Sequence, residues 1–205
     1  LFTGPRGVGK TTIARLIAKG VNCLNNGITD NPCGICDNCK EIAQGISMDM
    51  IEIDAASNRG IDEIRELKEK INYQPVKGRK KVYIIDEVHM LTKEAFNALL
   101  KTLEEPPSHV IFILATTEID KIPDTVISRC QRYDFQPIEA KDITALLKEV
   151  AEKENITIDK ESLNLIYRKS EGSARDSFSI FEQVVSNFNG EDIDISKTQK
   201  ALGLS

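Results

Sequence analysis

Short apolar runs recur along the first part of the chain, separated by longer stretches with helical periodicity. A continuous apolar run of this length is typical of a strand in a parallel sheet, because helices cover both of its faces. Strands that alternate with helices predict an α/β fold with helices on both faces of the sheet. The predicted strands are Met50–Asp54, Val82–Asp86, Val110–Thr116 and Arg132–Phe135, with Leu1-Phe2 as the tail of another.

The stretches between these runs place apolar residues three and four positions apart, as one face of a helix requires. The pattern predicts three helices, and the last of them ends before Pro106-Pro107 because proline cannot continue a helix. Their apolar faces are marked by Ile13, Leu16 and Ile17, by Ile61, Ile64, Leu67, Lys68 and Ile71, and by Phe96, Leu99, Leu100 and Leu103.

The pattern changes near Pro137. From Lys141 onward only helical periodicity remains, in Ile143–Glu152, Glu161–Lys169 and Ala174–Phe188, and residues 191–205 are polar and then weakly helical. We therefore expect two domains. Residues 1–139 hold the sheet, and residues 140–205 form a small helical domain and the start of a linker.

Composition narrows the class of protein. The chain is 40% apolar and 29% charged, which is ordinary for a globular protein. No apolar run approaches the roughly 20 residues that span a bilayer, so we expect no membrane segment. A net charge of −5 argues against a surface covered in phosphate-binding charge, although a local basic stripe stays possible. The chain opens on Leu1 within a motif, so we expect a fragment whose targeting information is unreadable.

A glycine-rich loop at the start of the chain fits the phosphate-loop pattern G-x-x-x-x-G-K-[ST]. Glycines let backbone N–H groups surround phosphate oxygens, and the positive end of the next helix points at them. Lys10 can then reach the β- and γ-phosphates, and the Thr11 hydroxyl can bind Mg²⁺. A turn that binds nothing is the less favoured interpretation, because a strand precedes the loop and a helix follows it. The predicted ATP-binding residues are Gly4, Pro5, Arg6, Gly7, Val8, Gly9, Lys10, Thr11 and Thr12.

Two carboxylates end the second full strand of the predicted sheet. Asp86 lies on the strand and is placed to hold the hydration shell of Mg²⁺ beside Thr11. Glu87 follows it and can orient and deprotonate an attacking water. Alone, such a pair is as easily a solvated strand end, but with a phosphate loop upstream it predicts an ATP-hydrolysing centre.

Four of the five cysteines fall close together and predict a metal site. Cys23, Cys33, Cys36 and Cys39 are spaced C-x9-C-x2-C-x2-C, which suits four thiolates around a tetrahedral ion. Four thiolates leave no open position, so the predicted ion is structural Zn²⁺. The alternative is four reduced thiols without metal.

Several longer motifs resemble the clamp-loader branch of the AAA+ ATPases. They are Asp86-Glu87-Val88-His89-Met90-Leu91, then Phe96-Asn97-Ala98-Leu99-Leu100-Lys101-Thr102-Leu103-Glu104-Glu105-Pro106-Pro107, and Ser128-Arg129-Cys130. The phosphate loop, the four cysteines and Ile53-Asp54-Ala55-Ala56-Ser57 narrow the resemblance to the gamma/tau family of the bacterial DNA polymerase III clamp loader. It extends over essentially the whole chain.

The resemblance implies a P-loop AAA+ domain with a zinc insert at 23–39, followed by a helical lid. It implies a cytoplasmic motor subunit that hydrolyses Mg·ATP and loads a sliding clamp onto primed DNA. The implied partners are the delta, delta prime and further gamma/tau subunits, the clamp, and the backbone of the DNA. In that family a segment before the phosphate loop holds the adenine, and a C-terminal domain drives oligomerisation; neither is found in this sequence.

The same resemblance implies roles for residues outside the main motifs. Thr117, with Thr116 second, matches a sensor that contacts the γ-phosphate or the attacking water. Arg175 matches a second sensor in the lid, although an ordinary charge at a helix start is the alternative. Arg129 matches the arginine finger that completes a neighbouring subunit's site, and a surface salt bridge is its alternative. Three residues match positions that face the DNA backbone, and ordinary solvated surface charge is the alternative interpretation. They are Arg59, Arg65 and Lys101.

Two other functions compete with this one. A non-hydrolysing scaffold subunit of the same assembly would have lost phosphate-loop residues, and Gly9, Lys10 and Thr11 are all present. Another AAA+ machine that works on DNA would not be expected to carry the zinc insert and the Ser-Arg-Cys motif.

Overall fold

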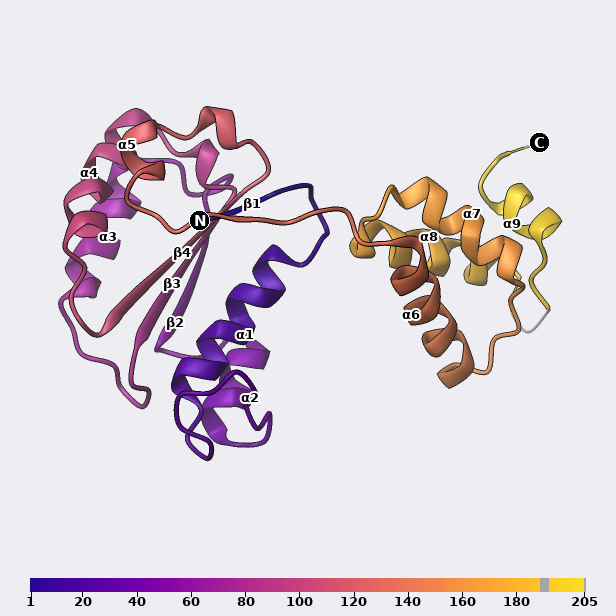
Figure 1. The fold of residues 1–205 in the computed structure, drawn as a ribbon, viewed down its shortest axis with the longest axis horizontal. Helices are drawn as coiled ribbons and strands as arrows, with labels where there is room; N and C mark the ends of the chain where they lie inside the picture. Colours follow the sequence, from indigo (N-terminus) through magenta and orange to yellow (C-terminus); the bar gives the residue numbers. More distant parts are fainter. Residues whose placement is uncertain (189–191, 205) are drawn as a thin grey trace. The chain divides into compact units, whose positions relative to one another are not determined.

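The computed structural model describes residues 1–188 and 192–204. The chain divides into two compact units, coloured from indigo to yellow along the sequence in Figure 1. The first contains Leu1–Gly4 and Lys10–Asp134, and the second contains Pro5–Gly9 and Phe135–Ser205. The second unit therefore includes the middle of the phosphate loop, which the division at residues 139 and 140 does not anticipate.

The first unit is built on a parallel sheet with the strand order β2-β3-β4-β1-β5. The prediction of a parallel sheet is confirmed. Two of the predicted strands have the observed bounds, and the ends of the other three differ by one residue. The strands are β1 (Phe2–Thr3), β2 (Met50–Asp54), β3 (Lys81–Asp86), β4 (Val110–Thr116) and β5 (Tyr133–Asp134). All pairings among these described strands are parallel, so their carboxyl ends share one edge of the sheet.

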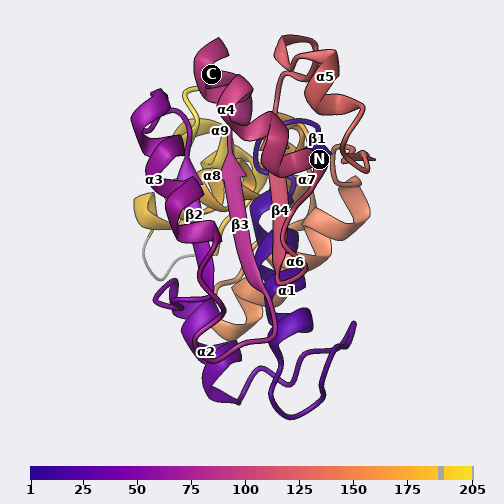
Figure 2. The same cartoon turned by 90° about the vertical axis from the view of Figure 1, so that its left-hand side faces the viewer.

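Helices cover both faces of this sheet, as Figures 1 and 2 show. One face carries α1 (Lys10–Asn22) and α2 (Asp37–Gln44), and the other carries α3 (Ile61–Ile71) and α4 (Lys93–Glu104). Short helical turns follow the strands that carry the site: η1 (Val88–Met90), η2 (Ile119–Lys121) and α5 (Asp124–Ile127).

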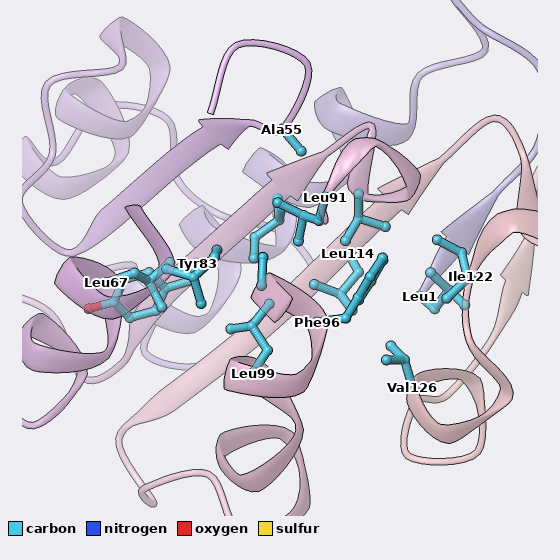
Figure 3. Close-up of a cluster of buried hydrophobic side chains, with 14 of the residues drawn as sticks. Leu1, Ala55, Leu67, Tyr83, Leu91, Phe96, Leu99, Leu114, Ile122 and Val126 are labelled. Carbon is cyan, nitrogen blue, oxygen red and sulfur yellow. The ribbon is translucent and has the colours of Figure 1, made fainter. Parts of the chain in front are cut away.

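A core of aliphatic and aromatic side chains fills the space between the sheet and the helices α3 and α4 (Figure 3). Tyr83, Leu99 and Leu114 belong to this core and are almost fully buried. Burial of one such side chain is worth about 1.5–3 kcal/mol, so this core is what holds the ends of β3 and β4 in place.

The face of α1 that packs against the sheet is not the one that its large apolar residues mark. Ala14 and Ala18 are fully buried, whereas Ile13, Leu16 and Ile17 are 37–43% exposed. Small side chains let the helix backbone approach the sheet closely, and this turns the larger residues outward.

The second unit contains helices α6 (Ala140–Lys153), α7 (Lys160–Ser170), α8 (Ala174–Asn187) and α9 (Ile195–Ala201). The three longer helices match the predicted ones and meet in a core that includes Ile143, Leu147 and Ile166. Side chains of Asp159, Ser173 and Asp194 accept hydrogen bonds from the first turns of α7, α8 and α9, which fixes where these helices begin. Among the described residues, no helix has the length and apolar character needed to cross a bilayer.

Candidate functional site

The carboxyl ends of three neighbouring strands carry the chemistry of the first unit. β1 leads into Gly4, β3 ends at Asp86 and β4 ends at Thr116. Because the order of these strands is β3-β4-β1, all three ends meet along one edge of the sheet. Open α/β sheets bind their ligands at this edge.

The Thr11 hydroxyl lies against the first carboxylate. Its Oγ1 donates a hydrogen bond to Asp86 Oδ2 at 2.8 Å, so a hydroxyl and a carboxylate face the same point. These are the hard oxygen donors that suit Mg²⁺, and the pair fits such an ion. Lys10 is only 6% exposed, and its Nζ donates to the carbonyl oxygen of Gly4 at 2.8 Å. That ammonium is thus held inside the loop, although Thr12 beside it is exposed.

The second carboxylate is held in an unusual backbone conformation. Glu87 has φ 47° and ψ 43°, the left-handed region that residues other than glycine rarely adopt. Such positions cluster at functional sites, where the surrounding contacts must stabilise them. Thr117 Oγ1 donates to Glu87 Oε2 at 3.0 Å, so the structure brings the first of the two candidate sensor threonines to this carboxylate.

The second threonine contacts a histidine that the sequence analysis did not single out. Thr116 Oγ1 lies 3.0 Å from Nδ1 of His89, and the same nitrogen lies 3.3 Å from Glu87 Oε2. On its other side, His89 Nε2 lies 3.2 Å from Glu118 Oε1. A hydrogen bond from Lys121 lowers the pKa of Glu118. The signal in the sequence that could have identified His89 is its position two residues after Glu87.

In the second unit, the middle of the phosphate loop packs against the start of α8. The Ala174 N–H donates to the carbonyl oxygen of Gly7 at 2.9 Å. Gly7 has φ 73°, and a Cβ there would lie 2.0 Å from Ser173 Oγ, so only glycine fits. Arg6 pairs with Asp176 at 3.0 Å, and their hydrogen bond lowers the pKa of Asp176. Arg175 is exposed. Its Cβ lies close to the loop, 3.3 Å from the position that a Cβ on Gly7 would occupy.

The four predicted metal ligands form one cluster. The sulfur atoms of Cys23, Cys33, Cys36 and Cys39 all lie within 4.8 Å of one another. Around a tetrahedral zinc with bonds of about 2.3 Å, neighbouring sulfurs lie roughly 3.8 Å apart, so the cluster fits that ion. Burial acts to raise the pKa of the Cys36 thiol, but N–H donors from Cys39 and Leu24 outweigh it and lower the pKa to about 6. Such donors stabilise thiolates, which are the form that binds metal.

Hydrogen bonds tie this cluster to the start of β3. The guanidinium of Arg79 donates to the carbonyl oxygen of Cys23 at 2.8 Å. Buried Asn22 accepts from the backbone N–H groups of Arg79 and Lys80 at 2.8 and 2.9 Å. The backbone carbonyl oxygen of Asn22 accepts a hydrogen bond from the side-chain amide of Asn38 at 3.0 Å. The cysteine loop is therefore fastened to the strand that ends at Asp86.

The residues predicted to act on other molecules lie on the surface. Arg129 Nε donates to Glu104 Oε1 at 2.8 Å, an ion pair within the chain. Arg65 pairs with Asp62 at 3.0 Å, and Arg59 donates to the carbonyl oxygen of Ala56 at 2.9 Å. Lys101 is exposed on α4. None of these four contacts the acidic pair among the described residues.

Comparison with solved structures identifies the fold. The chain is similar to the Thermotoga maritima RuvB Holliday junction branch migration motor, with a TM-score of 0.68 and 17% sequence identity. The match covers 99% of this chain and 60% of that one. The chain accordingly shares the fold of that motor, with a parallel sheet between helices and a second unit made of helices.

Two family descriptions match the sequence. Residues 1–139 match the family described as DNA polymerase III, delta subunit, and residues 142–190 match the ATPase lid domain of a DNA polymerase III clamp loader subunit. The two matches together span most of the chain.

Curated relatives agree with these matches. The chain is 50% identical to the DNA polymerase III gamma subunit of Buchnera aphidicola subsp. Baizongia pistaciae, over 100% of this chain and 55% of the relative. It is 50% identical to the tau subunit of Escherichia coli K12, over 93% of the chain and 30% of the relative. It is 51% identical to the tau subunit of Bacillus subtilis 168, over 98% of the chain and 35% of the relative. The chain thus spans about a third to a half of the length of these relatives, and it belongs to the family of DNA polymerase III clamp-loader subunits.

Proposed function

We propose that this chain is the ATPase core of a motor subunit that loads a sliding clamp onto primed DNA during chromosomal replication. The observation that carries the proposal is the joint arrangement of Thr11 with Asp86 and of Thr117 with Glu87 at one sheet edge. A non-hydrolysing scaffold subunit has no need for both pairs. The relatives named DNA polymerase III gamma and tau subunits supply the biological setting. A cytoplasmic location is part of this proposal.

Each residue at the edge of the sheet has a distinct task in this proposal. The loop from Gly4 to Gly9 surrounds the phosphates of ATP, and Lys10 neutralises their charge. Thr11 and Asp86 would hold Mg²⁺, and the charge of that ion would offset the charge that develops on the phosphates. Glu87 orients and deprotonates the attacking water, with Thr117 beside it as a sensor. The product of the reaction is ADP with inorganic phosphate.

Two arginines extend the site beyond this edge. Arg175 has the task of the second sensor, which contacts the γ-phosphate of the chain's own nucleotide. The support for this assignment is its match to the family motif, together with its place beside Gly7 of the loop within the second unit. Arg129 acts as the finger that completes a neighbouring subunit's site. The neighbours are the delta, delta prime and further gamma/tau subunits of the assembly, together with the clamp.

The contacts to DNA in this proposal involve only its backbone. Arg59, Arg65 and Lys101 are exposed cations of the first unit, and backbone phosphates are the groups they would bind. Zinc in the four-cysteine cluster has a structural role, because four protein ligands leave no position for a substrate.

Mixed assemblies test whether Arg129 acts between subunits. In the assembled full-length loader, Arg129→Ala should be nearly inactive, because an arginine finger contributes about 10³–10⁵-fold in rate. Lys10→Ala should also be nearly inactive, because it loses the ammonium that neutralises the phosphates. Mixtures of the two should regain clamp-stimulated ATP hydrolysis wherever an intact phosphate loop faces an intact finger. Absence of regain, in complexes whose mass shows both variants, contradicts action in trans. Absence of any clamp-stimulated hydrolysis by the wild-type assembly contradicts the proposed function itself.

A further inference from the structure

One buried side chain beside Glu87 has no task in the proposed function. His89 lies in η1 and its side chain is only 5% exposed. Its two ring nitrogens contact Glu87 and Thr116 on one side and Glu118 on the other, at 3.0–3.3 Å. All three partners are side chains at or directly after the strand ends that form the site.

The second histidine of the chain shows what a purely structural role looks like. His109 Nε2 lies 2.9 Å from the carbonyl oxygen of Ile71, and its Nδ1 lies 3.4 Å from the exposed side chain of Gln74. It lies just before β4, at the opposite end of that strand from Thr116. The partners of the partly buried His109 imidazole are therefore a backbone group and a surface amide. His89 has its partners at the hydrolysis centre instead.

We propose that His89 is a positioning residue that orients the Glu87 carboxylate for water activation and couples it to Glu118. The inference rests on the proposed function. Thr117 and His89 both contact Oε2 of Glu87, so two partners fix one oxygen of the carboxylate. The other oxygen, Oε1, is then the one that receives the proton of the attacking water.

The backbone of Glu87 explains why such support is needed. A residue with a side chain in the left-handed region is strained by about 1–3 kcal/mol, and its surroundings must hold it there. The same surroundings set where the carboxylate points. Glu118 lies in the segment after β4 and pairs there with Lys121 at 2.7 Å. The contacts that hold the Glu87 side chain therefore continue, through His89, into that segment.

Two substitutions separate the two sides of the imidazole. The amide of asparagine lies near the place of Nδ1, so His89→Asn keeps the contact toward Glu87 and loses the one toward Glu118. The longer His89→Gln reaches the place of Nε2 and keeps only the contact toward Glu118. Misplacement of a reacting group by about 1 Å can cost on the order of 10²-fold in rate. In the assembled full-length protein we therefore expect His89→Gln to lower kcat about 10- to 100-fold with unchanged affinity for Mg·ATP.

The comparison of the two variants decides the proposal. His89→Asn should recover most of the kcat that His89→Gln loses, and His109→Gln serves as the matched control that keeps the wild-type kcat. An unchanged kcat in His89→Gln overturns the inference. Equal losses in both variants also overturn it, because they indicate a structural role that any replacement disturbs.

A spectroscopic measurement tests the contact without any ATP hydrolysis. In full-length protein labelled with ¹⁵N-histidine, the ring signals absent from His89→Asn belong to His89. Glu87→Gln should shift these signals, whereas Glu104→Gln should leave them in place. Identical His89 signals in the wild type and in Glu87→Gln overturn the inference. If the wild type hydrolyses no ATP, the proposed function fails, and this measurement still judges the contact between the two side chains.

Discussion

Replacement of Cys39 by serine removes one ligand from the predicted zinc site. Cys39 is fully buried and its sulfur is within reach of the other three, so serine there leaves an incomplete ligand set. We expect the Cys39→Ser protein to contain no zinc and the wild type to contain about one zinc per chain.

The size of the effect on stability follows from the loop that the metal closes. Closure of a loop of about 15 residues is worth about 3 kcal/mol by the loop-entropy relation, and the segment from Cys23 to Cys39 is close to that length. The loss spreads into the first unit, because Asn22 and Arg79 fasten this segment to the start of β3. We therefore expect the free energy of unfolding to fall by about 3 kcal/mol.

Equilibrium unfolding in urea measures this difference, and elemental analysis of protein purified without added metal measures the zinc. Wild type treated with a chelator under reducing conditions is the control, and it should unfold at the same urea concentration as Cys39→Ser. If the chelated and untreated wild types unfold together, zinc does not stabilise the fold. A zinc content near zero, with Cys23, Cys33, Cys36 and Cys39 all titrating as free thiols, refutes the site itself.

Three further predictions concern single side chains. Glu87→Gln should leave Mg·ATP binding intact by calorimetry and slow its hydrolysis, whereas Lys10→Ala should weaken binding itself; a wild-type rate for Glu87→Gln excludes it as the base. Asp49→Asn should destabilise the protein by about 2–4 kcal/mol in urea, since this buried carboxylate accepts three backbone N–H groups at 2.6–2.8 Å; a loss of under about 0.5 kcal/mol contradicts this. Gly7→Ala should lower Tm more than Gly9→Ala, because a Cβ at Gly7 collides with a neighbour and one at Gly9 meets nothing within 4 Å; equal shifts exclude the collision.

Much of the site could be predicted because its parts are local in sequence. A phosphate loop and a strand that ends in Asp86-Glu87 need only a few consecutive residues, and the parallel sheet then brings them together. The cysteine cluster was predictable for the same reason, since its spacing sets its geometry. Strands were recognised as apolar runs because helices cover both faces of the sheet.

The remaining features depend on contacts between distant residues. Successive strand residues point to opposite faces, so a shift of one residue in the end of β4 exchanges Thr116 with Thr117. Only the structure assigns Thr117 to Glu87 and Thr116 to His89. The face of α1 that packs against the sheet could not be predicted either. Periodicity marks an apolar face of a helix, but it does not show how closely the sheet approaches that helix.

The ion pair between Arg129 and Glu104 bears on both interpretations of this arginine. The two side chains are 30% and 46% exposed, and an exposed pair of this kind contributes about 0–1 kcal/mol. A finger that raises a rate by about 10³–10⁵-fold stabilises the transition state by roughly 4–7 kcal/mol. The second quantity is several times the first, so the pair with Glu104 is too weak to hold Arg129 away from a neighbouring nucleotide. The ion pair is therefore compatible with a finger that rests on its own chain and changes partner when the assembly forms.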